Sequence, residues 1–144
     1  MNPDDAKAGE AREWLDKASE DLASARVLVV SGHYANALFF CQQAAEKSLK
    51  AYLTWHERPF RRTHDLEELG QACAVIDGAP LALIDEADVL SDYAWKLRYP
   101  GSPYVPDSAE TEAMVALATS IFGEVRALLP ENARSVGPDG AALP

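Results

Sequence analysis

Residues 34–55 read YANALFFCQQAAEKSLKAYLTW, and this stretch is the strongest indication of the fold class. Its apolar side chains recur every three or four residues, which is the period of an amphipathic helix. Five alanines in the same stretch favour a close approach of neighbouring helices. The inward stripe predicted from this period is Tyr34, Leu38, Cys41, Ala45, Leu49 and Tyr52. We therefore expect one long helix here, packed closely against others.

Segments on both sides of this stretch have the same period, and none alternates in the two-residue pattern of a strand. Long helices are predicted over residues 10–30, 81–97 and 109–129, and a shorter one over residues 64–77. The short Ser31-Gly32 link makes the first two helices antiparallel neighbours. The sequence therefore predicts an all-α fold, an up-and-down four-helix bundle with an additional short helix.

The ends of the predicted helices carry recognisable signals. Asp65, followed three residues later by Glu68, has the spacing of a capping box. Asp107 or Ser108 can cap the last helix, and Pro130 stops it. The buried side of that last helix is predicted to be Met114, Ala118, Ile121, Val125 and Leu128.

The length and composition indicate one globular domain. A chain of 144 residues with 48% hydrophobic and 25% charged residues is ordinary for this class. We expect a flexible N-terminus over residues 1–9, the bundle domain over residues 10–129 and a disordered tail over residues 130–144. No apolar stretch has the form of a secretory signal or reaches the roughly 18 residues that span a bilayer, so a cytoplasmic protein is expected.

The acidic balance of the chain limits its ligands. The formal net charge is -10 and the sequence pI is about 4.6. Broad binding to DNA or RNA is not expected, because such binding comes from Lys and Arg side chains that neutralise phosphates. A small anionic ligand held in one local basic patch is compatible with this charge.

The cysteines and histidines give no sign of a metal site. Cys41 and Cys73 lie inside helical patterns without a CxxC pair, which is typical of buried free thiols. The two cysteines and three scattered histidines lack the spacing of zinc ligands, so neither a metal nor a cofactor is expected. The sequence also contains no Gly-rich phosphate loop and no Ser-His-Asp set.

Three stretches carry side chains that could perform chemistry. The first is QQAAEKSLKAYL, residues 42–53, in which Glu46 and Lys50 are four residues apart. Such a pair supports a helix weakly when it is solvated. Alternatively, the polar side chains form a seam that bonds a partner helix or a ligand.

The other two stretches are RPFRRTHDL, residues 58–66, and LRYP, residues 97–100. In the first, arginines precede His64, whose imidazole can serve as a general base or donate a hydrogen bond inside the bundle. In the second, Arg98 closes a helix, where a cation complements the helix dipole, and Tyr99 begins an extended connection.

Taken together, QQAAEKSLKAYL, then THDLEEL after a basic loop, then LRYP at the end of a later helix closely resemble the HEPN domain family. The family is named for higher eukaryotes and prokaryotes nucleotide-binding. The resemblance covers roughly residues 10–129 and depends on the order and spacing of the three motifs. It implies a bundle of four helices plus a short one, often as a homodimer. Many members are encoded beside a minimal nucleotidyltransferase and form a complex with it, and others are toxins or ribonucleases.

The resemblance leaves two hypotheses open. In the first, the chain is a nucleotide-binding or accessory module, a non-catalytic partner of a separate minimal nucleotidyltransferase and part of a toxin–antitoxin pair. In the second, it is a metal-independent endoribonuclease whose catalytic pair would be Arg58 and His64, with the five intervening residues typical of that branch. Pro59 after Arg58, the loop position of the pair and the lack of a His after Arg98 depart from the nuclease pattern. The binding module is therefore preferred.

For the binding module, the site residues implied by the resemblance and by side-chain chemistry are Lys47, Lys50, His64, Arg98 and Tyr99. The two lysines would attract phosphate. The guanidinium of Arg98 could clamp a phosphate bidentately while Tyr99 stacks on a base. The arginines of residues 58–62 would form a basic lip beside the site.

Overall fold

The computed structural model describes residues 2–76, 78–79, 81–97, 100–101 and 104–134. Within these ranges every element of regular secondary structure is a helix, which confirms the predicted fold class. The elements are α1 (Pro3–Val30), α2 (Tyr34–Trp55), α3 (Leu66–Ala74), α4 (Leu81–Leu97), α5 (Ser108–Leu128) and a 3₁₀ turn, η1 (Glu131–Ala133). None of these helices combines enough length and apolar character to cross a membrane, as far as the described residues go.

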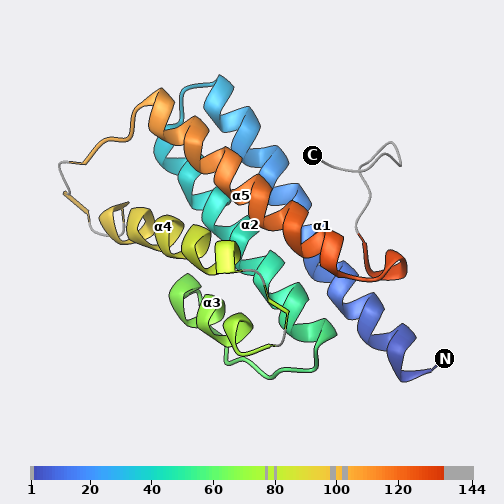
Figure 1. Cartoon of the computed structure of the whole chain (residues 1–144). Helices are drawn as coiled ribbons and strands as arrows, with labels where there is room; N and C mark the ends of the chain where they lie inside the picture. Colours follow the sequence, from blue (N-terminus) through green and yellow to red (C-terminus); the bar gives the residue numbers. More distant parts are fainter. Residues whose placement is uncertain (1, 77, 80, 98–99, 102–103, 135–144) are drawn as a thin grey trace.

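Three long helices form the centre of the fold. α1 and α2 lie antiparallel, and α5 packs against both of them (Figure 1). α4 packs on α2 and α5, while the short α3 contacts α2 and α4. Since α2 contacts α1, α3, α4 and α5, the stretch from which the fold class was predicted is also the centre of the structure.

The core consists largely of the side chains that the helical period indicated. The stripe of α2 is buried from Leu38 through Tyr52. Burial raises the pKa of both Cys41 and Cys73 to about 12, so these free thiols behave as small apolar side chains, as predicted. In α5 the prediction for Leu128 is wrong: Leu128 is 43% exposed and Leu129 is 2% exposed. The backbone turns extended at Leu129, so the side chain after the helix, and not the last helical one, reaches the core.

The turn between α1 and α2 closes as predicted. Gly32 has a φ of 81°, in the left-handed region that glycine adopts without strain. The amide of His33 donates to the carbonyl of Leu28 at 2.8 Å, and the amide of Gly32 donates to the carbonyl of Val29 at 3.1 Å. This pair of bonds is the Schellman motif, which satisfies the last carbonyls of a helix.

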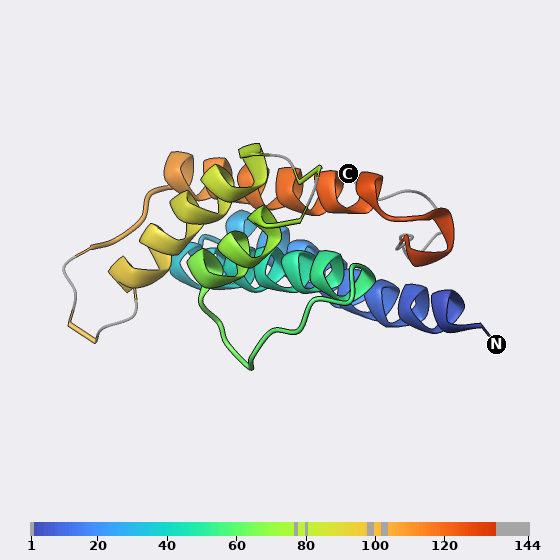
Figure 2. The ribbon, with the colours of Figure 1, turned by 60° about the horizontal axis from the view of Figure 1, so that its bottom comes forward.

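A second Schellman motif ends α2, with Glu57 in the place of the glycine. Glu57 has a φ of 54°, and the amide of Arg58 donates to the carbonyl of Leu53 at 2.9 Å. A non-glycine residue costs about 1–2 kcal/mol in this conformation. The turn directs the chain into the arginine-rich connection between α2 and α3, which stands away from the helices in Figure 2.

The N-termini of α3 and α5 have the predicted caps, but the capping box predicted at α3 is incomplete. The carboxylate of Asp65 accepts from the amides of Glu67 at 3.0 Å and Glu68 at 3.3 Å. The capping box is not completed, however, because the Asp65 amide donates to Thr63 Oγ1 at 3.0 Å while the Glu68 carboxylate pairs with Arg61. At α5 the cap is Asp107, which accepts from the Glu110 amide at 2.7 Å.

The flexible N-terminus expected over residues 1–9 is wrong for residues 3–9, which belong to α1. Asn2 caps the helix by accepting from the Asp5 amide at 2.8 Å, and Pro3 occupies the first helical position. Ala8 is buried, and the Lys7 ammonium lies 4.6 Å from the ring centroid of Trp55 at the end of α2. These contacts extend α1 by two turns.

The disordered tail expected from residue 130 is wrong for residues 130–134. η1 packs against α1, and Ala133 is fully buried. The Arg134 side chain donates to the carbonyls of Leu129 at 3.0 Å and Ala127 at 3.4 Å, which satisfies acceptors at the end of α5. Residues 135–144 lie outside the described residues.

Candidate functional site

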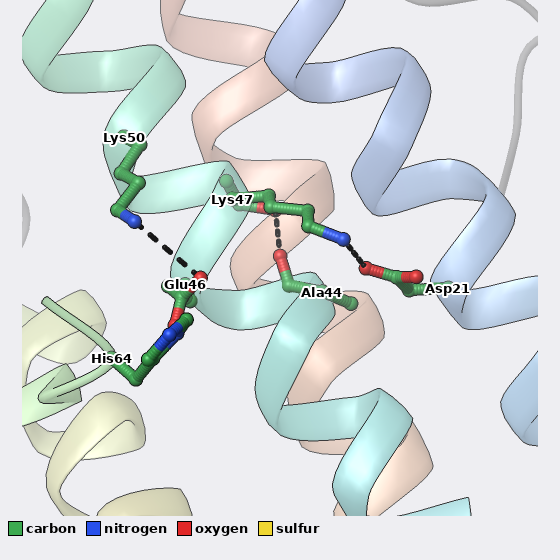
Figure 3. Close-up of polar contacts among 7 residues, drawn as sticks. Asp21, Ala44, Glu46, Lys47, Lys50 and His64 are labelled. Atoms are coloured by element: carbon green, nitrogen blue, oxygen red, sulfur yellow. Dashed lines mark hydrogen bonds and ion pairs between the residues drawn. The ribbon is translucent and has the colours of Figure 1, made fainter. Parts of the chain in front are cut away.

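The polar side chains in the middle of α2 point in two directions, and that of Lys47 points toward α1. Its ammonium lies 2.6 Å from Asp21 Oδ2, and both side chains are largely buried (Figure 3). Asp21 is only 8% exposed, so its carboxylate needs this partner. Lys47, predicted to attract phosphate, joins α1 to α2 through this ion pair, and the candidate site described below does not include it.

Lys50 and Glu46 form a buried pair on the other side of α2. The Lys50 ammonium lies 3.5 Å from Glu46 Oε2, and the two residues are 7% and 3% exposed. The same ammonium lies 5.3 Å from the ring centroid of Trp14 and 5.7 Å from that of Phe60. Aromatic faces stabilise a desolvated cation, so Lys50 is held inside the fold as the counter-ion of Glu46, and the phosphate contact predicted for it stays a prediction.

His64 reaches from the connection before α3 back to this buried pair. Its Nδ1 lies 2.7 Å from Glu46 Oε1, and Figure 3 shows His64 pointing toward Glu46. The His64 side chain is 78% exposed, whereas the Glu46 side chain is 4% exposed. The structure therefore brings Lys50, Glu46 and His64 together, with only the imidazole accessible.

The connection that carries His64 is held at both ends. Phe60 packs edge-on against Trp14 of α1, with ring centroids 6.2 Å apart and an interplanar angle of 66°. At the other end, the bond from the Asp65 amide to Thr63 and the Asp65 cap tie the backbone to the start of α3. His64 is thus fixed by its backbone on both sides and by Glu46 at its ring.

The arginines near His64 differ in their contacts. The Arg61 guanidinium pairs with Glu68 at 2.7 Å across an exposed surface. Arg58 and Arg62 are exposed, and no carboxylate of the described residues pairs with them. No hydrogen bond joins Arg58 to His64 within the described residues, so the pair expected for a nuclease is not assembled by direct contact.

A second histidine near this connection adds no positive charge to it. His56 stacks on Tyr52, with ring centroids 4.5 Å apart. Burial lowers the pKa of His56, and the charges of Lys7 and Arg58 lower it further. His56 is therefore neutral at neutral pH, and the local positive charge comes from the arginines.

Two predicted residues, Arg98 and Tyr99, lie outside the described residues. α4 ends at Leu97, one position before them. Sequence reasoning missed Glu46 as a site residue, since its spacing to Lys50 explained both as a helix pair. His64 is 18 residues away in the sequence, and no periodic signal links it to Glu46. No group of three or more side chains suited to a metal ion occurs in the part of the chain that the structure describes.

Comparisons with solved structures agree on the fold. The archaeal HEPN homologue ST0689 has a TM-score of 0.69 at 24% identity, and the match covers 83% of this chain and 98% of that one. TT1696 from Thermus thermophilus has a TM-score of 0.66 at 30% identity, covering 80% of this chain and 94% of that one.

A curated relative and a family model match the sequence itself. The candidate toxin MJ1304 of Methanocaldococcus jannaschii is 38% identical over 52 residues, which are 36% of this chain and 34% of that protein. The match thus spans about a third of the relative's length. The model of the HEPN domain matches residues 11–128. Because that match covers most of the sequence, this chain belongs to the HEPN domain family.

Proposed function

We propose that the chain is a nucleotide-binding accessory module that holds nucleotide phosphates at His64 and the adjoining arginines. The observation that carries the proposal is the His64 side chain, which is 78% exposed although its Nδ1 is bonded to a buried carboxylate. A surface side chain that is already fixed loses little conformational entropy when it binds a ligand. The geometry therefore suits recognition of a ligand from solvent.

The charge around His64 suits an anion. Arg58 and Arg62 extend from the same connection, and a guanidinium can bond two phosphate oxygens at once. Lys50 compensates the charge of Glu46, so that carboxylate does not repel an anion as strongly as an unpaired one would. A local anion site of this kind is compatible with a chain of net charge -10.

We further propose that a separate minimal nucleotidyltransferase is the partner, and that the two chains form a toxin–antitoxin pair. Membership of the HEPN family supports the partner, and the similarity to the candidate toxin MJ1304 supports the toxin role. A homodimer is proposed on the same family grounds. Co-expression with a nucleotidyltransferase encoded beside this gene, followed by affinity purification and sedimentation, tests both assemblies. Recovery of this chain alone and as a monomer would contradict them.

Substitution of His64 tests the binding site. We expect His64→Ala to weaken ATP binding about tenfold in calorimetric titration, because one charge-assisted hydrogen bond is lost. Arg98→Ala should also weaken binding, as the family motif implies. The control is Arg126→Ala in the last turn of α5, which should leave the affinity unchanged. Equal effects of the three substitutions, or no ATP binding by the wild type, would refute the proposed site.

The second candidate function is RNA cleavage, and the orientation of His64 by a carboxylate favours it. General bases in enzymes are commonly imidazoles oriented in this way. The test is incubation of the purified protein with total RNA in EDTA. Cleavage that disappears in both His64→Ala and Arg58→Ala would establish the nuclease in place of the non-catalytic module.

A further inference from the structure

We propose that Glu46 is the positioning residue of this site, because its buried carboxylate fixes both the direction and the tautomer of the His64 imidazole. The inference rests on the proposed function for the identity of the ligand alone. The contact between Glu46 and His64 is a property of the folded chain.

The direction of the hydrogen bond follows from the chemistry of the two groups. Glu46 Oε1 lies 2.7 Å from His64 Nδ1, a distance typical of a strong bond to a carboxylate. The other carboxylate oxygen faces the ammonium of Lys50 at 3.5 Å. An ionised carboxylate accepts and does not donate, so the proton of this bond belongs to Nδ1.

Glu46 itself has little freedom to move. It lies in the middle of α2 and is 3% exposed. Lys50, one turn further on, has its ammonium 5.3 Å from the ring centroid of Trp14 and 5.7 Å from that of Phe60. The ring of His64 is therefore oriented by a chain of packed contacts that reaches α1.

The consequence concerns the outer nitrogen of His64. With the proton on Nδ1, the Nε2 atom of a neutral ring presents a lone pair to solvent. In a charged ring the same atom presents an N–H that can donate to a phosphate oxygen, while Glu46 balances the charge. Glu46 thus makes Nε2 the atom that meets the ligand in either state.

The tautomer can be measured by ¹⁵N NMR of the full-length chain, with the His64 signals assigned from their loss in His64→Ala. We expect the neutral His64 of the wild type to carry its proton on Nδ1. Two double variants separate the hydrogen bond from packing. Glu46→Met with Lys50→Met removes the acceptor without leaving a buried charge unpaired. Glu46→Gln with Lys50→Met keeps an acceptor oxygen in nearly the same place.

The methionine variant, in which Glu46 and Lys50 are both replaced by Met, should lose the preference for the Nδ1–H form. It should also bind ATP about tenfold more weakly, which corresponds to one charge-assisted hydrogen bond. The glutamine variant should retain the Nδ1–H form in larger part. The control is Asp21→Met with Lys47→Met, which removes the other ion pair of α2 and should leave the His64 signals unchanged. Far-ultraviolet circular dichroism checks that each variant is folded.

Each outcome separates this inference from the proposed function. A wild-type His64 with its proton on Nε2, or a methionine variant with unchanged His64 signals, would overturn the positioning role even if ATP binds. The expected tautomers without any ATP binding would support the positioning role and refute the nucleotide site.

Discussion

At the residue scale, the two turns that flank α2 use the same backbone motif with different residues. Gly32 occupies the left-handed position in one, and Glu57 occupies it in the other. The glycine was evident in the sequence, whereas residues 56–59, HERP, contain no glycine or asparagine that would indicate a left-handed residue in the second turn. That turn directs the chain into the connection that carries His64, and it places local strain on Glu57.

Replacing the strained residue should stabilise the protein. We expect Glu57→Gly to raise the free energy of unfolding by about 0.5–1 kcal/mol, because relief of the left-handed strain exceeds the added entropy of the unfolded chain. The exposed pair of Glu57 with Lys7, at 3.5 Å, contributes little. Urea denaturation measures the change. Gly32→Ala is the opposite control and should lower stability by about 1 kcal/mol. A less stable Glu57→Gly variant would contradict this account.

At the element scale, helical period sufficed to locate most helices but not the contacts between distant side chains. The bounds of α2 and α4 agree with the predicted ranges, since turns and prolines mark their ends. The start of α1 was missed because its first turns are polar, and only the Asn2 cap and Pro3 indicate a helix there. For the candidate site, the sequence singled out His64 but not its contact with Glu46, because that contact depends on tertiary packing.

The contact between α4 and α5 includes two carboxyl groups, Glu86 and Glu124. Each has one carboxylate oxygen, Oε2, that is buried without a hydrogen-bond partner. Burial raises the pKa of Glu124, and the neighbouring Glu86 carboxyl raises it further, while Ser120 opposes the shift. Two acidic groups in this arrangement favour a state in which one of them is protonated.

The raised pKa of Glu124 gives a testable dependence of stability on pH. The protonated form of Glu124 is favoured in the folded state. Its contribution to the free energy of unfolding is therefore fully present below the pKa of Glu124 in the unfolded chain, and it is lost as pH rises through the pKa of Glu124 in the folded chain. We expect Glu124→Gln to remove this dependence and to raise the free energy of unfolding at pH 8 by about 0.5 kcal/mol, the magnitude of a like-charge neighbour. Urea denaturation between pH 4 and pH 8 measures it. The exposed Glu112→Gln serves as control, and an equal gain in that variant would assign the effect to net charge alone.

At the scale of the whole molecule, the fold was predictable because one buried stripe per helix is enough to specify a bundle. The relative placement of α3, α4 and the arginine-rich connection was not predictable, because the period of a helix shows which of its sides is buried but not which neighbour it packs against. Phe122 illustrates the limit within a helix. It was absent from the predicted inward set of α5, yet it is fully buried, as is its neighbour Ile121.

The burial of Phe122 predicts how stability is distributed over the molecule. α5 contacts α1, α2 and α4, and Phe122 is one of the largest fully buried side chains, so a cavity at this position weakens the packing of α5 in the bundle. We expect Phe122→Ala to lower the free energy of unfolding by about 3–5 kcal/mol, from lost burial and the cavity together. That is a large share of the roughly 5–15 kcal/mol typical of a domain, so the variant should unfold at much lower urea. Phe39→Ala is the matched control, because Phe39 is 53% exposed and its removal should cost less than about 1 kcal/mol. Comparable losses from the two substitutions would mean that the face of α2 around Phe39 is covered in solution and that the core does not lie where the structure places it.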